Sequence, residues 1–186
     1  MDNFNLTNHF LIAMPSLEDP NFARTVTFIC VHNDDGALGV VINRPLTVNL
    51  AEVFEQMDIA CADTSLNARE VYEGGPVHKD RGFILHRPVG DWDSSIQVTP
   101  DIAVSTSRDI LEAMGSGTGP NENLVALGYA GWGAGQLEFE MSENAWLSGP
   151  AQHEIIFSVP ANERWRLAAA GMGVDIENLS GDVGHA

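Results

Sequence analysis

The chain is 186 residues long, and 44% of its residues are hydrophobic and 19% charged, the balance of an ordinary globular protein. Nine basic residues face twenty-six acidic ones, so the formal net charge at pH 7 is −17. Because polyanions are held by cationic side chains, this charge opposes direct binding to nucleic acid and to anionic membranes.

Length and cysteine content predict one domain, residues 1–186, in the cytoplasm. A chain of this length buries roughly 70% of its unfolded surface, so its stability requires neither a metal nor a disulfide. Apolar runs fall short of the ~20 residues of a membrane-spanning helix, and residues 1–5 lack the positive charges of a signal peptide. Cys30 lies far from Cys61 in an apolar run, which predicts a buried, reduced thiol.

The first third of the chain alternates apolar segments with turns. Phe10–Met14 is a short apolar strand. The β-branched and aromatic residues of Thr25–Val31 predict a second strand, paired with a third at Ala37–Asn43. The sequence Asn-Asp-Asp-Gly at 33–36 is typical of a hairpin turn, and Arg44-Pro45 is expected to end the hairpin.

A helix is expected from Asn49 to about Ile59, because Asn49 and Glu52 have the spacing of a capping box. Its apolar residues fall at helical spacing and form one stripe: Leu50, Val53, Phe54 and Met57. The polar segment Cys61–Arg69 is predicted to be a loop.

Short strands and one short helix are expected before the central segment. Glu70–Glu73 leads into a tight turn at Gly74-Gly75-Pro76-Val77. Thr106 and Asp109 resemble a capping box for a helix that ends at Met114. Three segments have strand character: Arg81–His86, Ile96–Val98 and Ile102–Ser105.

The segment Asn123–Glu138 is expected to organise the fold. Its apolar run Leu124–Gly128 predicts a strand covered on both faces, followed by a glycine-rich turn and a helix at Gln136–Glu143. The turn either packs closely against its neighbours or holds a phosphate at the helix N-terminus. Close packing is favoured, because the segment lacks the Gly-x4-Gly-Lys-Ser/Thr pattern and Glu138 would repel an added anion.

The C-terminal part is expected to contain two strands and one helix. Ala145–Leu147 and Ile155–Val159 have strand character, and the residues after Pro160 have helical spacing. The polar tail at 175–186 is predicted to be partly mobile. Strand hairpins interspersed irregularly with three to four helices predict the α+β class.

Ordered blocks along almost the whole chain resemble the bacterial YqgE/AlgH family. They are Phe10–Pro15, Gly36–Pro45, Gly74–Val77, Arg81–His86, Leu127–Glu138, Asn144–Leu147 and Gly184–Ala186. The resemblance implies an α+β domain with a bifurcated mixed β-sheet folded as a pseudo-barrel. It implies little chemistry, although some members carry a transcriptional-regulator label.

The sequence contains no established pattern for metal binding or nucleophilic catalysis. None of the six histidines has His-x3-His or His-Glu-x-x-His spacing, and there is no Gly-x-Ser-x-Gly motif. Histidines at strand ends more often form hydrogen bonds that hold the strands. Arg81 and His86 are predicted to lie on opposite faces of their strand unless a bulge at Gly82 intervenes. No catalytic residue, metal or cofactor is therefore predicted.

Two rigid turns carry polar groups that suit a small cleft. In one interpretation Arg44 forms an internal ion pair that ties two turns together. In the other, a cleft accepts a small anionic or peptide ligand. The candidate ligand-binding residues are Asn43, Arg44, Tyr129, Trp132 and Gln136.

Three functions remain open from the sequence. The favoured one is a non-enzymatic binding or regulatory protein that acts through a protein partner. The second is an enzyme or small-molecule sensor that uses the cleft just described. The third is a regulator that binds DNA directly, which the net charge of the chain opposes. No membrane partner is expected, and the oligomeric state stays open.

Overall fold

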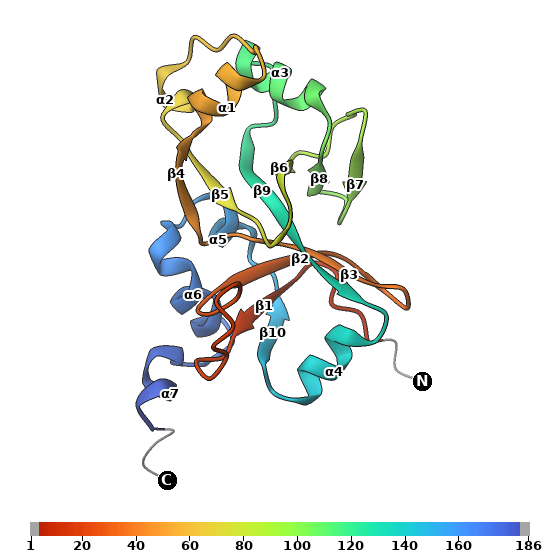
Figure 1. Cartoon of the computed structure of the whole chain (residues 1–186), viewed down its shortest axis with the longest axis vertical. Coiled ribbons are helices and arrows are strands. Elements are labelled where there is room, and N and C mark those ends of the chain that lie inside the picture. Colours follow the sequence, from red (N-terminus) through yellow and green to blue (C-terminus); the bar gives the residue numbers. More distant parts are fainter. Residues whose placement is uncertain (1–3, 183–186) are drawn as a thin grey trace.

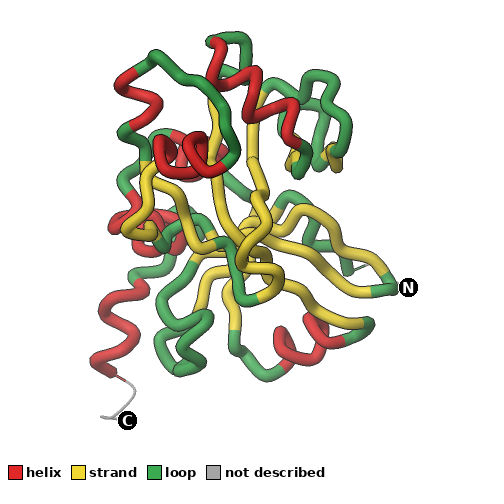
Figure 2. The backbone as a smooth tube through the Cα atoms, turned by 45° about the horizontal axis from the view of Figure 1, so that its top comes forward, coloured by secondary structure: helices red, strands yellow, loops and turns green. Residues whose placement is uncertain are grey.

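A computed structural model describes residues 4–182 of the chain. One ten-stranded sheet runs through the molecule, and the helices lie around it (Figures 1 and 2). Its main path is β10-β1-β2-β3-β9-β6-β8-β7, with β4 and β5 joined to β9 at the side. The strands are β1 (His9–Ala13), β2 (Val26–Asn33), β3 (Gly36–Val41), β4 (Pro45–Asn49), β5 (Glu70–Glu73), β6 (Val77–Arg87), β7 (Ser95–Gln97), β8 (Ala103–Ser105), β9 (Glu122–Gly133) and β10 (Trp146–Pro150).

The described residues contain seven helices, two of which are only four and five residues long. They are α1 (Leu50–Gln56), α2 (Thr64–Asn67), α3 (Arg108–Ser116), α4 (Gln136–Ser142), α5 (His153–Phe157), α6 (Ala161–Ala170) and α7 (Ile176–Asp182). Helices α1 and α3 cover the upper end in Figure 1, and α4 lies at the opposite end of β9.

Strand β9 is shared by two halves of the sheet. Its first part pairs antiparallel with β6, and its last residues, Ala130–Gly133, pair antiparallel with β3. Ala126 and Leu127, which pair with β6, also pair with β5, and this is the one parallel strand pair in residues 4–182. The sheet thus forks along β9 and curls into a half-barrel, so the predicted α+β class with a bifurcated, barrel-like sheet is confirmed.

Glycines allow the backbones to meet where the sheet forks. Gly74 donates its N–H to the carbonyl of Leu127 and accepts the N–H of Val41, both at 2.8 Å. A Cβ on Gly75 would lie 2.1 Å from the carbonyl carbon of Tyr129. Gly128 has φ +83°, and a Cβ there would lie 2.5 Å from the Gly75 oxygen. These contacts explain why glycines, which lack a Cβ, occupy these positions.

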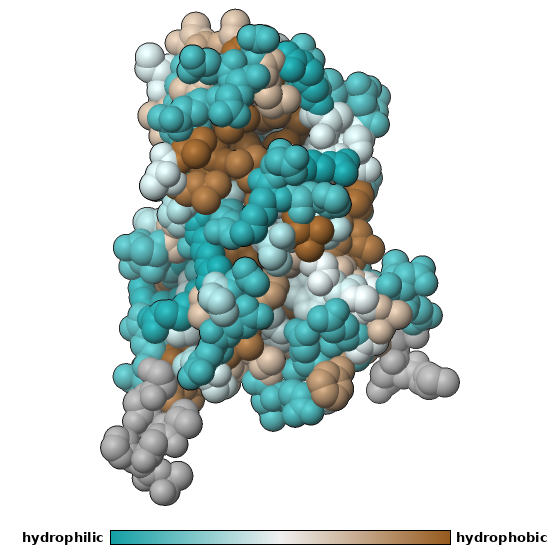
Figure 3. Space-filling view, viewed as in Figure 1, coloured by the Kyte–Doolittle hydropathy of each residue, from teal (hydrophilic) through white to brown (hydrophobic). Residues whose placement is uncertain are grey.

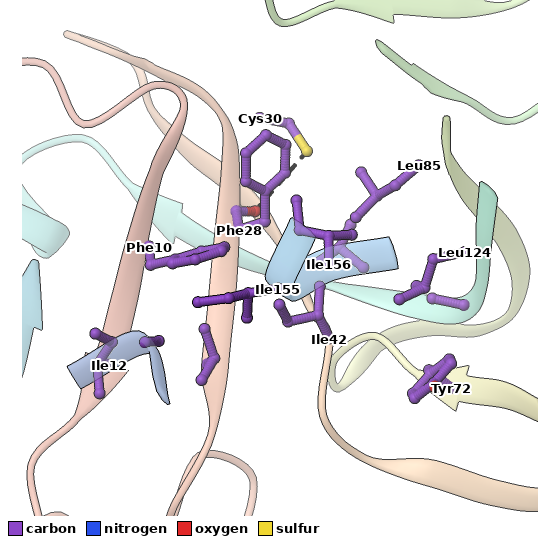
Figure 4. Packing of buried hydrophobic residues seen from close by; sticks show 14 of the residues in the cluster. Phe10, Ile12, Phe28, Cys30, Ile42, Tyr72, Leu85, Leu124, Ile155 and Ile156 are labelled. Carbon is purple, nitrogen blue, oxygen red and sulfur yellow. Dashed lines mark hydrogen bonds between the residues drawn. The ribbon is translucent and has the colours of Figure 1, made fainter. Parts of the chain in front are cut away.

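The two faces of β9 belong to different apolar clusters. Leu124 and Ala126 face the largest cluster, which β1–β3, α5 and α6 enclose (Figure 4). Val125 faces a second cluster beneath α1 and α3. The prediction that this strand is covered on both faces is confirmed. Cys30 lies in the first cluster as a free thiol, and burial raises its pKa far above the usual value.

The hairpin and the first capped helix are confirmed. Strands β2 and β3 pair through the turn at 33–36, with a bulge between Ile29 and Val31. Helix α1 begins after Asn49, whose side chain accepts the N–H of Glu52 while the Glu52 carboxylate accepts the N–H of Asn49. This reciprocal pair satisfies two amides that the helix leaves without a partner.

The predicted glycine-rich turn after Gly128 is wrong. Strand β9 continues through Gly131 to Gly133, and the chain turns only at Ala134-Gly135 before α4. Gly131 lies opposite Leu38, and Gly133 lies opposite Gly36. Pairing with β3 therefore keeps the glycines in extended backbone, and it overrides their preference for turns.

The strand predicted at Ile155–Val159 is also wrong, because this segment contains helix α5. Ile155 and Ile156 are both buried in the largest cluster. A short apolar run fits a buried strand as well as a buried helix, so its pattern does not decide between them. Helix α3 is preceded by Ser107 instead of Thr106, and β4 and α2 were not expected.

The C-terminal tail begins with helix α7, and the remaining residues 183–186 of the predicted mobile tail lie outside the described part. None of the helices in residues 4–182 combines the length and hydropathy needed to cross a membrane.

Candidate functional site

Asn43 and Arg44 bind backbone groups of one neighbouring loop. The Asn43 amide accepts the N–H of Val26 and donates to the carbonyl of Arg24, both at 2.9 Å. The Arg44 guanidinium donates to two carbonyls of segment 21–24, at 2.8 and 3.0 Å. The interpretation in which Arg44 forms an internal ion pair is therefore wrong for the described residues, because carbonyl oxygens take the place of a carboxylate.

Trp132 and Gln136 meet at the opposite end of β9, around Glu140. The Trp132 indole donates to Oε1 of Glu140 at 3.0 Å, and the Gln136 amide donates to Oε2 at 3.0 Å. Trp146 donates to the same Oε1 atom, also at 3.0 Å. The side-chain N–H groups of Trp132 and Gln136, which suggested a ligand site, thus both donate to Glu140.

Tyr129 lies apart from both groups and lines a separate cavity, described below. The structure therefore places the five sequence-predicted residues in three settings. A ligand-binding role for them as one cleft stays a prediction.

A larger apolar cavity of about 520 Å³ opens between α1, α3, β6 and β9. We call it the apolar cavity. Figure 3 shows hydrophobic residues gathered on the surface below α1 and α3. The apolar lining side chains are Val48, Val53, Met57, Ile84, Leu111, Val125 and Leu127. A cavity of this size and character is typical of binding sites.

Two arginines line this cavity, Arg81 from β6 and Arg108 from α3. Arg108 pairs with Glu112 at 3.7 Å, in an exposed i,i+4 arrangement. Arg81 forms no ion pair with any described residue; its nearest polar partner is Oγ1 of Thr106, at 3.4 Å. In a chain with so few cations, the exposed Arg81 guanidinium is available to an acidic group of a ligand.

The Arg81 side chain also lines a second cavity, of about 260 Å³, on the other side of β6. We call it the hydroxyl cavity, because Ser94, Ser95 and Thr106 contribute to its wall. Its remaining lining residues are Leu38, His78, Phe83, Ile96, Val104 and Tyr129. The bulge between Val77 and Gly82, with the left-handed Gly128, turns Tyr129 to this side while Leu127 faces the apolar cavity.

A chain of hydrogen bonds leads from Ser95, in the wall of the hydroxyl cavity, through Ser105 to the buried His86. We call it the hydroxyl chain. Ser95 Oγ is bonded to Ser105 Oγ, and Ser105 Oγ to Nε2 of His86, at 2.7 Å. Nδ1 of His86 donates to the carbonyl of Pro88 at 3.0 Å. Burial lowers the pKa of His86, so the imidazole is neutral near pH 7. His86 and Arg81 were expected on opposite faces; His86 is buried, whereas Arg81 is exposed.

Sequence reasoning missed both cavities. Arg81 was singled out only as a neighbour of His86, and Ser94 and Ser95 lie in a polar segment without any recognisable motif. No local sequence pattern identifies these residues, because their side chains come together only when β6, β8 and β7 pair.

Groups of three or more potential metal ligands are not formed among the described side chains. The two buried histidines instead form hydrogen bonds to segments that lie beside them in the fold. His32 accepts the N–H of Leu6 at Nδ1 and lies 3.1 Å from Glu138 through Nε2, and His86 belongs to the hydroxyl chain. This pattern fits histidines that hold neighbouring segments in place.

Comparison with known proteins gives the family. A family model described as AlgH-like matches residues 10–177. The chain is similar to a UPF0301 protein of Thioalkalivibrio sulfidiphilus, with 57% identity over 98% of this chain and 97% of the relative. A UPF0301 protein of Nitrosococcus oceani is 52% identical over 96% of both chains.

Two solved structures share the fold. The solution structure of the AlgH protein from Pseudomonas aeruginosa has a TM-score of 0.81 and 49% identity, covering 100% of this chain and 98% of that one. A crystal structure of a protein from Corynebacterium diphtheriae has a TM-score of 0.72 at 21% identity, over 92% and 90% of the two chains, and shows the fold alone. The names of these relatives state no activity. With its resemblance, family match and fold in agreement, the chain belongs to the AlgH-like family.

Proposed function

We propose that this chain is a non-enzymatic regulatory or binding protein that acts through a protein partner. The observation that carries the proposal is the apolar cavity of about 520 Å³, which leaves side chains such as Val53 and Met57 only partly covered. Concave, mostly apolar cavities of roughly 300–1,000 Å³ are the usual binding sites of soluble proteins.

Charge indicates the kind of partner. Two arginines and one carboxylate, Arg81, Arg108 and Asp80, flank the apolar lining, so its charged rim is net positive in a chain whose net charge is −17. A partner segment with two or three apolar side chains beside a carboxylate would fill the cavity and reach one of these guanidinium groups. Charge-assisted hydrogen bonds of this kind are short and directional, and they fix the register of a bound segment.

An effect on transcription, if the protein has one, would be indirect. Four of its arginines donate to neutral oxygens of the protein: Arg44, Arg69, Arg81 and Arg164. Arg87 and Arg166 pair with glutamates. These cations are spread over separate elements, and the net negative charge repels a duplex. We further propose a cytoplasmic location, which the two free thiols support, because reducing compartments keep cysteines unpaired.

The test is site-specific photo-crosslinking in cells of the source organism. A benzophenone amino acid at Met57, in the apolar cavity, should capture a defined protein. The same amino acid at Phe139 is the control, because Phe139 is 63% exposed on α4, at the far end of β9. A partner found at both positions, or at neither, contradicts the proposal.

The captured protein is then purified, and its affinity is measured with two matched variants. Met57→Glu introduces a charge into the apolar cavity and should weaken binding at least tenfold, because the charge loses its hydration when the partner covers it. Phe139→Glu makes a similar change outside the cavity and should leave the affinity unchanged.

A further inference from the structure

Three aromatic rings, those of His78, Phe83 and Tyr129, line one wall of the hydroxyl cavity. The ring centroids of Phe83 and Tyr129 are 5.2 Å apart, and those of His78 and Tyr129 are 5.9 Å apart. Phe83 is buried, whereas Tyr129 is partly covered and His78 is exposed. The volume of about 260 Å³ beside these rings has room for one more planar ring.

The Arg81 guanidinium lies beside this aromatic wall. The guanidinium carbon of Arg81 lies 5.8 Å from the centroid of Phe83, and the Nη2 atom reaches Oγ1 of Thr106 at 3.4 Å. Arg81 is not tied to a carboxylate among residues 4–182, so most of its donors remain for a ligand. The planar guanidinium matches a carboxylate, which accepts two parallel hydrogen bonds from it.

The hydroxyl chain fixes the hydrogen-bonding polarity of Ser95. The Pro88 carbonyl can only accept, so Nδ1 of His86 carries the proton and the Nε2 atom of the neutral ring accepts from Ser105. The hydroxyl proton of Ser105 is then used, and Ser95 must donate its own proton to Ser105 Oγ. Ser95 therefore presents only lone pairs to the cavity.

We propose that the hydroxyl cavity binds a small single-ring aromatic carboxylate that carries a hydrogen-bond donor on the ring. The carboxylate pairs with Arg81, the ring packs on Phe83 and Tyr129, and the donor reaches Ser95. This site lies on the other side of β6 from the apolar cavity and shares Arg81 and Thr106 with it. Binding of the aromatic carboxylate to the purified chain needs no protein partner, and a carboxylate of such a partner would then pair with Arg108.

Three probes separate the parts of this recognition. 4-Aminobenzoate has the ring, the carboxylate and the donor; benzoate lacks the donor, and 4-aminobenzamide lacks the charge. Titration of the purified full chain by NMR should give a Kd for 4-aminobenzoate on the order of 0.1–1 mM, the range of ligands this small. We expect about fivefold weaker binding of benzoate, and at least tenfold weaker binding of 4-aminobenzamide. Equal affinities for all three probes, or no shifts at residues of the hydroxyl cavity, overturn the proposal.

Variants test the assigned partners. Arg81→Gln should weaken 4-aminobenzoate at least tenfold, and Arg81→Lys should restore part of the loss because it keeps the charge. Ser95→Ala should remove the preference for 4-aminobenzoate over benzoate. Ser116→Ala, at the end of α3, is the matched control and should keep both affinities. If Ser95→Ala keeps the full preference for the amine, the donor does not reach Ser95 and the proposal is wrong.

The polarity of Ser95 has a readout on the wild-type chain that does not depend on any ligand. Nitrogen-15 NMR of the His86 imidazole at pH 7.5 should show a protonated Nδ1 and a bare Nε2 atom. A proton on Nε2 would leave the Ser105 proton free to bond to Ser95 Oγ, so Ser95 would no longer be restricted to accepting from the cavity, and this would contradict the argument for the ligand's donor.

Discussion

The indole N–H groups of Trp132 and Trp146 both donate to one atom, Oε1 of Glu140, each at 3.0 Å. The two rings meet edge to face, with centroids 6.2 Å apart, and both side chains are buried. One carboxylate on α4 therefore accepts the indole N–H groups of two tryptophans from different parts of the sheet, one on β9 and one on β10.

Glu140→Ala should destabilise the protein by roughly 2–4 kcal/mol, because it leaves two buried indole donors without an acceptor. Glu140→Gln keeps an acceptor oxygen and should cost about half as much. Urea unfolding, followed by tryptophan fluorescence, measures both. Glu143→Ala, which follows the same helix, is the control and should lie within ~0.5 kcal/mol of wild type. Equal losses for the alanine and glutamine variants of Glu140 would contradict this account.

Gly75→Ala should destabilise the fold by at least ~2 kcal/mol. The added Cβ would lie 2.1 Å from backbone atoms of Tyr129, which have no freedom to move within the sheet. Gly117→Ala is the control, because it also has positive φ but has nothing within 4 Å of the new Cβ. It should cost only ~1 kcal/mol, the strain of a left-handed residue. Thermal or urea unfolding compares the two, and similar losses would rule out the close approach as the cause.

Stability should fall as the pH is lowered from about 7 to 5. Burial lowers the pKa of His86, and burial followed by the nearby Arg87 charge lowers that of His153. The unfolded chain therefore binds protons at a higher pH than the folded chain, near the ordinary histidine pKa of about 6.5. The free energy of unfolding then decreases as the pH falls through this value.

His86→Gln should reduce the slope of this pH dependence, whatever it does to stability at pH 8. His78→Gln is the control, because His78 is exposed. Urea unfolding at half-unit steps of pH measures the slope, and an unchanged slope in His86→Gln would be inconsistent with a neutral, buried His86.

The two cysteines should react at different rates. Cys61 is partly exposed, whereas Cys30 is 1% exposed and burial raises the pKa of its thiol. The thiolate is the reactive form, so a disulfide reagent should modify one thiol of the folded chain quickly and the other only on unfolding. Cys61→Ser should remove the fast phase; a fast phase that persists in this variant would place Cys30 at the surface.

Mobility-shift titration with duplex DNA at about 150 mM salt should show no specific complex. At this ionic strength charges are screened beyond ~8 Å, so binding depends on direct contact between cations and phosphates. Binding to a defined duplex that resists excess competitor DNA would contradict both the charge argument and the proposed protein partner.

Sequence patterns predicted those elements whose signals are local. The hairpin at 33–36, the Asn49–Glu52 capping box and the covered strand at Leu124–Gly128 each depend on residues close together in the chain. The errors arose where distant pairing decides. Gly131 and Gly133 stay extended because β3 lies beside them, and Ile155 and Ile156 are helical in a core that several elements enclose.

The site was the least predictable part, because its residues come from strands and helices far apart in the chain. Arg81, Ser95 and Tyr129 share a cavity only after β6, β7 and β9 have paired. Asn43 and Arg44 looked functional because turns often carry function, yet their donors are used by the loop at 21–24.

The forked strand β9 has a consequence for the dynamics of the molecule. Because β9 holds hydrogen bonds to β3, β5 and β6, neither half of the sheet can open without disturbing the other. Amide hydrogens on both sides of the fork should then exchange with solvent through the same global opening, while helix ends and loops exchange through local fraying. The strand makes the two halves one cooperative unit, so a ligand that tightens one cavity would slow exchange around the other.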